Sequence, residues 1–513
     1  MTRSAFCAPS LFRCIFRQIS VMPAHIDGDD HVALPFIEGG VYQSENERLV
    51  EVINPSTGRH CLSIPTGCEA DVNRAVSSAR HAFEDGRWSD APPSFRKKTL
   101  QRLADLVEAE APTLDALDAG EMGKPVGELF CNAAGAAGLL RFFAEAVDKV
   151  MGDVYTSDKH SLVVQRRVPR GVVGAIVPWN FPTFVALLKV APALAAGNCV
   201  VLKPSELSSR SAVRLAELAI QAGLPPGVLN VVPGLGQMIG KALALHMDVN
   251  MVTFTGSTDV GKQIMHYASQ SNMKVVMAEC GGKSPQIVFG DGVDLYAASE
   301  SIAKLLLTNQ GQICSVGSRL LVHRSVEKTV IDKIAQRVER IVMGDALDPK
   351  ATFGPLASAK QCARVMHYIE GAKGEGAERV IGGNQVRQDT GGYFVEPTIY
   401  RNVAPTSRLA QDEIFGPVLA VTSFDDEAEA IRIANSTMYG LVAYVWTANL
   451  STGMRMAKGI RSSVRINAAP PAGEGAGHAA SNEPYGQSGI GVEGGLAGMA
   501  GYLRYQRIAF SHA

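Results

Sequence analysis

One cysteine stands in a setting unusual for a packing residue. Cys314 lies in the segment NQGQICSVGSR (309–319), between amide side chains and a glycine-serine stretch. A structural cysteine usually sits among Val, Leu and Ile, where its thiol is inert. The polar neighbours here, which include Asn309 and Ser315, indicate a thiol that another molecule must reach. From this segment alone, a plain packing role remains the commoner alternative.

Two further segments place polar side chains directly after apolar runs. VPWNFP (177–182) carries Asn180, and LKPSE (202–206) carries Lys203 and Glu206. If the apolar runs are parallel strands, these side chains lie at the carboxyl edge of a sheet, where ligands bind. The alternatives are a turn asparagine locked between two prolines and charged residues at the surface.

A glycine-rich turn and a glutamate complete the set. FTGSTDVG (254–261) has the glycines and small hydroxyls that a phosphate-approaching loop needs, although it is not a GxGxxG motif and many βα turns need a glycine. MAECGGKSP (277–285) holds Glu279 ahead of a Gly-Gly pair, 35 residues before Cys314. Glu279 alone could be a capping or pairing residue. The order of all these segments is more informative than any one of them.

Composition limits the class of protein. The chain has 513 residues, 46% hydrophobic and 19% charged, which predicts two or three globular domains. A formal net charge of −1 gives no basic surface for nucleic acid or anionic membrane, and no apolar run reaches the roughly 18 residues of a membrane span. The nine cysteines form no CxxC and the 11 histidines fall at no ligand spacing, so we expect free thiols, a reducing compartment and no metal.

The first 29 residues differ from the rest. They contain Arg3, Arg13 and Arg17, and the part before Asp27 has no acidic residue, as in an organelle transit peptide. The preferred interpretation is a disordered extension ahead of a start at Met22, with the enzyme in the cytoplasm.

The elements that must position these residues follow a clear pattern. Segments 69–85 and 94–119 repeat apolar residues every three or four positions, which predicts helices. From residue 171, short apolar runs alternate with helical segments of ten to sixteen residues, and the alternation begins again near 284. This predicts βαβ units and parallel sheets, hence an α/β fold. A Gly/Ala/Pro-rich stretch, 467–489, is expected to be a long loop.

The motifs, in their order, resemble the NAD(P)-dependent aldehyde dehydrogenase superfamily over nearly all of residues 30–510. PWNFP, KPSE, FTGS, GGKSP, GQxC and EIFGP are all present. The resemblance implies a Rossmann-type NAD-binding domain, an α/β catalytic domain and a small β oligomerisation region. The expected boundaries are, for the NAD-binding domain, 30–150 and 169–281; for the catalytic domain, 282–479; and for the oligomerisation region, 151–168 and 480–513.

The resemblance also assigns catalytic roles. Cys314 matches the nucleophile that forms a thiohemiacetal and then a thioester with the substrate. Asn180 and the Cys314 backbone N–H would stabilise the oxyanion, and Glu279 would activate water for deacylation. Lys189 and Glu493 are placed in the proton path behind Glu279. Aldehyde dehydrogenases that transfer the acyl group to coenzyme A generally lack this glutamate. Its presence here makes water the expected acyl acceptor.

Lys203 and Glu206 match residues that hold the adenosine ribose. A carboxylate there accepts the 2′-hydroxyl and repels a 2′-phosphate, so NAD is expected to be preferred and NADP less used. The other implied cofactor contacts are Val177, Trp179, Gly236, Gly256, Ser257, Gln361, Glu413 and Phe415.

The substrate is poorly encoded. The implied tunnel residues are Phe181, Val185, Leu188, Ile313 and Ser315, with Glu474 at the mouth. Glu474 could attract a cationic aldehyde, such as an ω-aminoaldehyde of polyamine catabolism, or could simply be solvated. Two departures leave the substrate mouth and the interface undetermined. The usual PFGG before the C-terminal glycines is absent, with SNEPYGQSGIG (481–491) in its place, and Val492 replaces a frequent Arg.

Cys280, beside Glu279, is expected to be a bystander thiol. The implied assembly is a homodimer or homotetramer. Two other classes stay open: a catalytically silent binding or structural member of the fold, and a thiol hydrolase. A hydrolase would need a histidine base, and no motif ties His266, His323 or His367 to Cys314.

Overall fold

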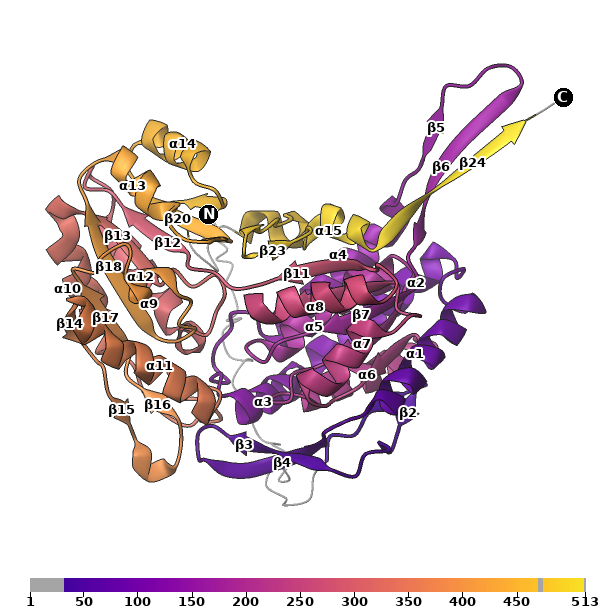
Figure 1. The fold of residues 1–513 in the computed structure, drawn as a ribbon, viewed down its shortest axis with the longest axis horizontal. Coiled ribbons are helices and arrows are strands. Elements are labelled where there is room, and N and C mark those ends of the chain that lie inside the picture. The colour runs from indigo at the N-terminus through magenta and orange to yellow at the C-terminus, as the bar shows by residue number, and fades with distance from the viewer. Residues whose placement is uncertain (1–31, 469–473, 512–513) are drawn as a thin grey trace, which may run out of the picture.

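The computed structural model describes residues 32–468 and 474–511, so the expected N-terminal extension lies outside the described residues. Two large sheets, each flanked by helices, form the body of the molecule, and a narrow three-stranded arm projects from it (Figure 1). The α/β fold expected from the sequence is confirmed. The proposed domain boundaries remain predictions.

The first sheet is built around five parallel strands. Its eight strands are, in spatial order, β2 (Gly40–Val41), β1 (Phe36–Ile37), β9 (Leu229–Val231), β8 (Cys199–Lys203), β7 (Val172–Ile176), β10 (Met251–Thr255), β11 (Val275–Glu279) and β23 (Gly489–Ile490). The five neighbouring strands β9, β8, β7, β10 and β11 run parallel to one another. The central strands β7 and β8 are buried at every position, as expected where helices cover both faces.

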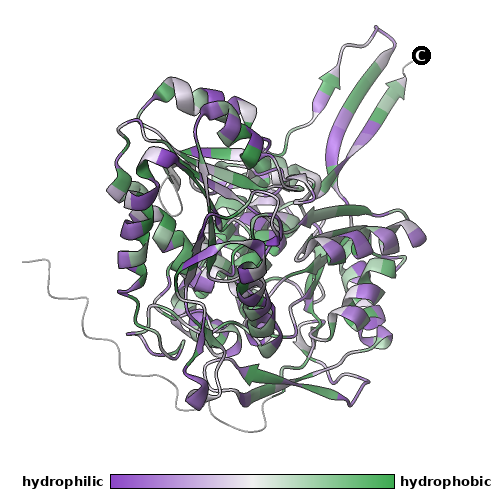
Figure 2. Cartoon of the chain, turned by 60° about the vertical axis from the view of Figure 1, so that its left-hand side comes forward, coloured by the Kyte–Doolittle hydropathy of each residue, from purple (hydrophilic) through white to green (hydrophobic). Residues whose placement is uncertain are grey.

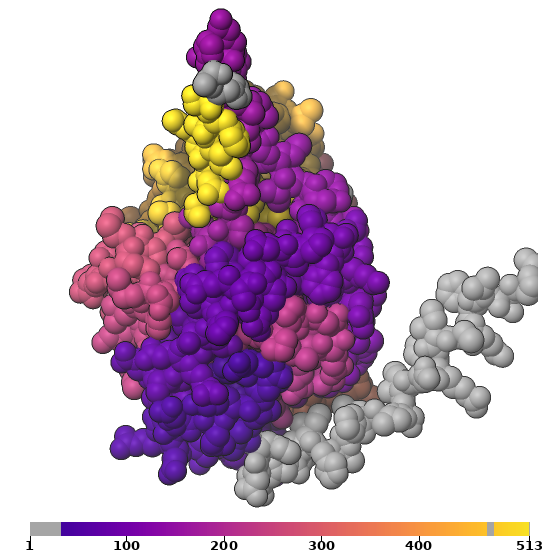
Figure 3. Space-filling view, turned by 90° about the vertical axis from the view of Figure 1, so that its right-hand side faces the viewer, coloured from indigo at the N-terminus to yellow at the C-terminus, as the bar shows by residue number. Residues whose placement is uncertain are grey.

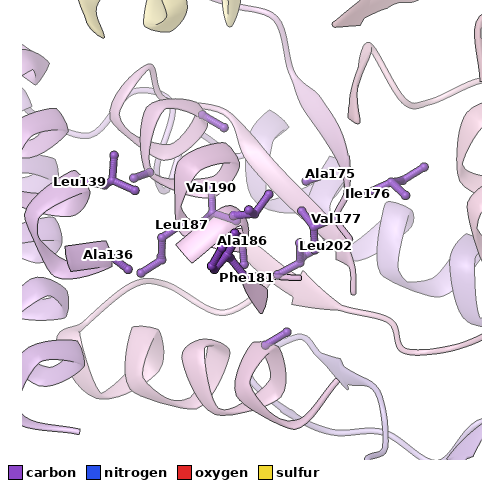
Figure 4. Close-up of a cluster of buried hydrophobic side chains, with 14 of the residues drawn as sticks. Ala136, Leu139, Ala175, Ile176, Val177, Phe181, Ala186, Leu187, Val190 and Leu202 are labelled. Carbon is purple, nitrogen blue, oxygen red and sulfur yellow. The ribbon is translucent and has the colours of Figure 1, made fainter. Parts of the chain in front are cut away.

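Helices on this sheet carry the residues that pack it. They are α1 (Glu69–Glu84), α2 (Pro93–Ala109), α3 (Ala111–Met122), α4 (Ala133–Ala146), α5 (Pro182–Ala195), α6 (Arg210–Ala222), α7 (Lys241–Leu245) and α8 (Thr258–Gln270). Helix α5 is apolar nearly all round and lies between α4 and the sheet, with Leu187 and Val190 among the side chains of β7, β8 and α4 (Figure 4). The pattern over 94–119 forms two helices, because the chain turns at Glu110 and Pro112 stands in the first turn of α3.

The second sheet has seven strands, parallel except at one edge. In spatial order they are β14 (Glu378–Ile381), β17 (Thr398–Arg401), β18 (Val418–Phe424), β13 (Arg319–His323), β12 (Pro285–Val288), β20 (Val442–Trp446) and β21 (Ser463–Ile466). The helices beside it include α9 (Leu295–Leu307), α10 (Glu327–Val338), α11 (Ala359–Gly371), α12 (Arg408–Gln411), α13 (Glu427–Ala434) and α14 (Leu450–Gly459). Colouring by hydropathy shows apolar strands inside and mixed outer helices (Figure 2).

A C-terminal segment joins the two sheets. Strand β22 (Tyr485–Gly486) pairs with β19 (Tyr439–Gly440) on the side of the second sheet. Four residues later, β23 pairs with β11 of the first sheet. The Ser488 hydroxyl accepts from Gly440 N at 3.0 Å, and Ser488 O accepts from Cys280 N at 2.8 Å. Residues 485–490, which we call the C-terminal clasp, are therefore bonded to both sides.

The arm consists of β5 (Asp153–Tyr155), β6 (Ser161–Pro169) and β24 (Leu503–Ser511), joined to the body by α15 (Gly495–Gly501) (Figures 1 and 3). Partners in register share a face, so Phe510 lies beside Leu162, and Val154 beside Val164. Val154, Leu162 and Phe510 are 72%, 38% and 50% exposed, which leaves an apolar face open on a single chain. None of the described helices is long and apolar enough to cross a membrane.

Candidate active site

The amide side chains around Cys314 hold its loop in place. Asn309, Gln310 and Gln312 are almost completely buried. Asn309 Nδ2 donates to Asn180 O at 2.7 Å, and Gln312 Nε2 donates to Asn309 O at 3.1 Å. Gln312 Oε1 accepts from Ala357 N at 3.0 Å. The amides therefore bond mainly to backbone groups, because a buried turn needs internal partners for its polar groups. That another molecule must reach the Cys314 thiol stays a prediction.

The backbone of this loop is unusual. Asn309, Gln310 and Gly311 have φ values of 46°, 55° and 70°, three consecutive left-handed residues. Such residues cost about 1 kcal/mol or more each when they are not glycine, and they persist only where surrounding contacts fix them. The buried amide bonds supply those contacts, so the position of Cys314 is determined by the loop as a whole.

Asn180 points its side chain at the same loop. It lies just after β7 and before α5, is 5% exposed, and donates from Nδ2 to Gln312 O at 2.9 Å. One amide hydrogen is used in this bond, and the other remains available for an oxyanion. Asp118 of α3 accepts from Thr183 N at 3.2 Å and so caps α5, whose own N-cap residue, Phe181, offers no side-chain acceptor.

The Cys314 thiol is half-buried and lies among carboxylates. Burial and the negative charges of Glu413 and Glu279 raise its pKa to about 12, so the thiol is protonated at neutral pH in this environment. Gly282 passes directly under the loop, and a side chain at that position would collide with the carbonyl oxygen of Cys314. Gly282 is thus required by the close approach of two backbones, and a side chain at Gly281 would collide with the carboxylate of Glu413.

Glu279 ends β11 and forms a charge-coupled group with two other predicted residues. Burial and the carboxylate of Glu493 raise its pKa to about 8, while the Lys189 ammonium acts in the opposite direction. Lys189 is fully buried in α5 and forms an ion pair with Glu493. Glu493 is held by reciprocal backbone hydrogen bonds with Asn482. The structure therefore brings together all five predicted catalytic residues.

The ends of β8 and β10 present the first group of predicted cofactor residues. Lys203 Nζ lies 3.2 Å from Glu206 Oε2, and Gly236 approaches this amine so closely that a Cβ there would lie 4.0 Å from it. Gly256 N donates to Glu279 O at 3.1 Å, which links the glycine turn to the catalytic glutamate. Ser257 is exposed, and its hydroxyl caps α8 by accepting from Val260 N. An open helix start beside a glycine cradle and a partly exposed carboxylate fits a dinucleotide.

The second group lies beside it. The Trp179 and Phe415 rings meet edge to face at 5.4 Å, and Gln361 Nε2 donates to Phe415 O at 2.7 Å. Glu413 accepts from Gly282 N at 2.9 Å, and burial raises its pKa to about 7. Val177, at the end of β7, is buried and donates its N–H to Lys203 O. Gln361 therefore supports the Phe415 segment, and Glu413 lies between the cofactor residues and Cys314.

The predicted tunnel residues gather in part. Phe181, Val185 and Leu188 share one face of α5, and Phe181 packs edge to face on Phe130 at 5.5 Å. Ile313 is buried, and Ser315 is half-buried beside Cys314. The side chain of Glu474 lies outside the described residues, so its place at the mouth stays a prediction.

Several residues of the site were not identified from the sequence. Tyr444 of β20 donates to Ser315 O at 3.0 Å, Phe130 packs on the tunnel face, and Asp118 caps α5. Tyr444 occupies a strand position that resembles any core residue, and Phe130 lies in a turn without a motif. Of these three residues, only Asp118 could have been found from the sequence, because it is an acidic residue on the apolar side of a predicted helix.

Comparison with known proteins agrees with this geometry. The pattern of the aldehyde dehydrogenase family matches residues 41–508. The chain is 43% identical over 434 residues to the NADP/NAD-dependent aldehyde dehydrogenase PuuC of Escherichia coli, covering 84% of this chain and 87% of the relative. It is 42% identical over 431 residues to an aminoacetaldehyde dehydrogenase of Pseudomonas aeruginosa, covering 84% and 86%.

A crystal structure of an indole-3-acetaldehyde dehydrogenase in complex with NAD+ superposes with a TM-score of 0.90 at 44% identity, covering 93% of this chain and 96% of the other. Fold, motif order and the grouping of Cys314, Asn180 and Glu279 therefore lead to one assignment. The chain belongs to the aldehyde dehydrogenase family, whose members are oxidoreductases acting on aldehydes.

Proposed function

We propose that the protein oxidises an aldehyde to a carboxylic acid with NAD as cofactor, water as acyl acceptor and Cys314 as nucleophile. The observation that carries this proposal is the meeting of Cys314, Asn180 and the Glu279 group at one point between the two sheets. A silent member of the fold has no need for this arrangement.

The first half of the reaction uses the loop of Cys314. The sulfur attacks the aldehyde carbon, and the oxygen that becomes negative is met by Asn180 Nδ2 and the Cys314 N–H. Because the thiol is protonated in its resting environment, its proton must leave during attack. Glu279 is the acceptor for this proton in its carboxylate form, which a pKa of about 8 leaves as the minor form at neutral pH.

Bound NAD, held by the Lys203–Glu206 and Trp179–Phe415 groups, supplies the hydride acceptor. The residues of this chain then release the product. Glu279 first passes the thiol proton to the Lys189–Glu493 pair, whose charges act on it, and so becomes a carboxylate again. It then takes a proton from water as the water attacks the Cys314 thioester, and the Cys314 sulfur leaves as the acid is released.

Replacement of the nucleophile tests the reaction. In Cys314→Ala we expect no formation of NADH from aldehyde, with NAD binding retained, because the alanine removes only the sulfur. Cys280→Ala is the matched control, since it removes a buried thiol one residue from Glu279. An active Cys314→Ala enzyme, or loss of activity only in Cys280→Ala, would refute the assignment.

The alternative of a thiol hydrolase finds no support among the histidines. His323 is bonded to Ser325 at 2.7 Å, and His266 and His367 are exposed on helices. None of the three appears among the charged groups that act on the Cys314 thiol.

The cofactor preference is assigned to Glu206. Its carboxylate, 39% exposed and 3.2 Å from Lys203 Nζ, would accept a ribose hydroxyl and repel a phosphate. We expect a much higher kcat/KM with NAD than with NADP, and a smaller ratio in Glu206→Gln. Equal use of both cofactors by the unmodified enzyme would contradict this role.

For the substrate, we propose ω-aminoaldehydes, supported by the similarity to PuuC and to an aminoacetaldehyde dehydrogenase. A mouth carboxylate at Glu474 would attract the cation over about 8–10 Å at physiological salt. The preference in kcat/KM for a cationic over a neutral aldehyde of equal length should fall with salt and in Glu474→Gln. Glu483→Gln is the matched control, and a preference for the neutral aldehyde would exclude the class.

Two further features support an oligomeric enzyme in a reducing compartment. The apolar face of the arm needs cover, which a second copy of the chain would provide. Six cysteines among the described residues, Cys61, Cys68, Cys199, Cys280, Cys314 and Cys362, are free thiols, which supports a reducing compartment.

A further inference from the structure

A small cavity lies at the amino-terminal edge of the second sheet, where β12, β13 and β20 begin. Its volume is about 10 Å³, and its lining includes Lys283, Ser284, Arg319 and Tyr439. None of the predicted catalytic, cofactor or substrate residues lines it. A volume of this size has room for about one water-sized species, which excludes phosphate and sulfate.

Two polar side chains of the cavity lining have no hydrogen-bond partner in the described part of the chain. Lys283 is 2% exposed, and its Nζ has no hydrogen-bond partner among the described residues. The same is true of the hydroxyl of Ser284, which is also 2% exposed. A buried ammonium without an acceptor is costly, so two unpartnered donors on residues that line one cavity indicate a ligand that accepts hydrogen bonds.

The charge of the lining indicates which acceptor. Among the described residues the cavity is lined by three basic side chains, those of Lys283, Arg319 and Arg461, and by no acidic one. Arg319 is 1% exposed and donates to the carbonyls of Lys283, Ile433 and Ala434 at 2.7–3.1 Å, so no carboxylate neutralises it there.

The nearest carboxylates have other partners. Glu413 accepts from Gly282 N, and Asp412 accepts from the Tyr368 hydroxyl at 3.1 Å. Burial and the positive charge of Arg319 lower the pKa of Lys283 to about 7. Glu413 and Asp412 oppose this lowering, and Arg364 adds to it. A negative species inside the cavity would stabilise the ammonium form directly.

We propose that this cavity binds a single monoatomic anion of the size of chloride, held by Lys283 Nζ and Ser284 Oγ under the field of Arg319. The site is independent of the aldehyde chemistry. Lys283 directly follows the Gly281-Gly282 pair, which contacts Glu413 and the Cys314 loop.

Long-wavelength diffraction from crystals of the whole enzyme grown in sodium chloride tests the site without any variant. An anomalous peak of chloride within about 3.5 Å of Lys283 Nζ is expected. Crystals grown in sodium gluconate should lack the peak. Density without anomalous signal in chloride crystals would identify a water molecule and overturn the proposal.

Melting temperature gives a second readout. At equal ionic strength, 0.1 M chloride should raise the Tm of the unmodified enzyme over gluconate by about 1–2 °C, because a ligand of the folded state stabilises it. Lys283→Met should abolish this difference. Lys274→Met is the matched control and should keep it, since Lys274 is also buried but its Nζ donates to Ala244 O and Ser271 Oγ, both at 2.6 Å. A chloride effect that is equal in both variants would contradict the site.

Discussion

At the scale of single residues, the chemistry depends on groups whose ionisation is set by their surroundings. Cys314 and Glu279 are both mostly protonated at neutral pH. Burial raises both pKa values, and the carboxylate of Glu413 adds to the rise for Cys314, as that of Glu493 does for Glu279. A base with a pKa near 8 is poised to exchange protons within the physiological range. The Lys189 ammonium opposes the further rise that Glu493 would cause.

The raised pKa of Glu279 predicts how deacylation depends on pH. The carboxylate is the active form, so the hydrolysis rate of a preformed Cys314 thioester should rise about tenfold per pH unit below 8 and level off above it. Stopped-flow measurement of acid release from pH 6 to 9.5 checks this. In Glu279→Gln the rate should be low and no longer show this rise. A profile that is flat in the unmodified enzyme would remove Glu279 from the step.

Much of this residue-level picture was predictable from the sequence, and the failures have physical causes. Cys314, Asn180 and Glu279 each stand in a motif, and the structure brings them together. The hydrogen bonds of Asn309 and Gln312 to the loop backbone were not predicted, because composition does not reveal which amides turn inward to satisfy a strained loop. Tyr444 was missed because its contact with Ser315 joins a strand to a turn 129 residues away in the sequence.

At the scale of elements, α3 holds the starts of two neighbouring helices. Its buried Asp118 accepts from Thr183 N of α5, and its buried Glu121 accepts from Ser209 N at 2.7 Å at the start of α6. Helix α5 follows Asn180 directly and carries Lys189. The carboxylates of α3 thus act on catalytic groups that they do not contact.

Removing the cap of α5 should show this. Asp118→Ala should lower stability by about 1 kcal/mol, as for a lost N-cap, and reduce turnover by up to about 10²-fold through displacement of Asn180. Asp118→Asn keeps an acceptor oxygen and should restore turnover. Thermal melting and kcat, measured together, separate this from a purely structural role, for which turnover per folded enzyme would be unchanged.

The stability of the folded protein should also depend on pH through the ionisation of Asp118. Burial raises the pKa of Asp118 to about 7 in the folded protein, above its value of about 4 when unfolded. Stability due to the protonated form is full below pH 4 and is lost as the pH rises towards 7. Asp118→Asn should therefore gain Tm relative to the unmodified enzyme across this window.

At the scale of the whole molecule, the arm leaves apolar surface uncovered. Leu162 and Phe510 are register partners on one face of a sheet that projects from the body (Figure 3). An exposed strand face of this kind is a usual site of subunit contact.

A charge on that face should break the assembly. Leu162→Asp should shift the enzyme from oligomer to a smaller species in analytical ultracentrifugation, because an aspartate cannot be buried there without a partner. Val342→Asp places the same charge at another exposed position, 52% exposed and outside the arm, and should leave the assembly unchanged. An unmodified chain that sediments as a monomer would exclude the proposed oligomer.

The C-terminal clasp has a consequence for how the enzyme exchanges its cofactor between turnovers. The clasp pairs with β11 of the first sheet and with β19, which leads into β20 of the second sheet. In addition, Gln487 O accepts from Thr258 Oγ1 of α8 at 3.0 Å, and Gln487 Oε1 accepts from Lys262 Nζ at 2.9 Å. Because the clasp is bonded to both sides, the two sheets cannot move apart by a hinge motion without breaking these hydrogen bonds. Spent cofactor must therefore leave by local movement of side chains and turns within a frame of fixed width. The radius of gyration in solution should accordingly stay the same when NAD is added.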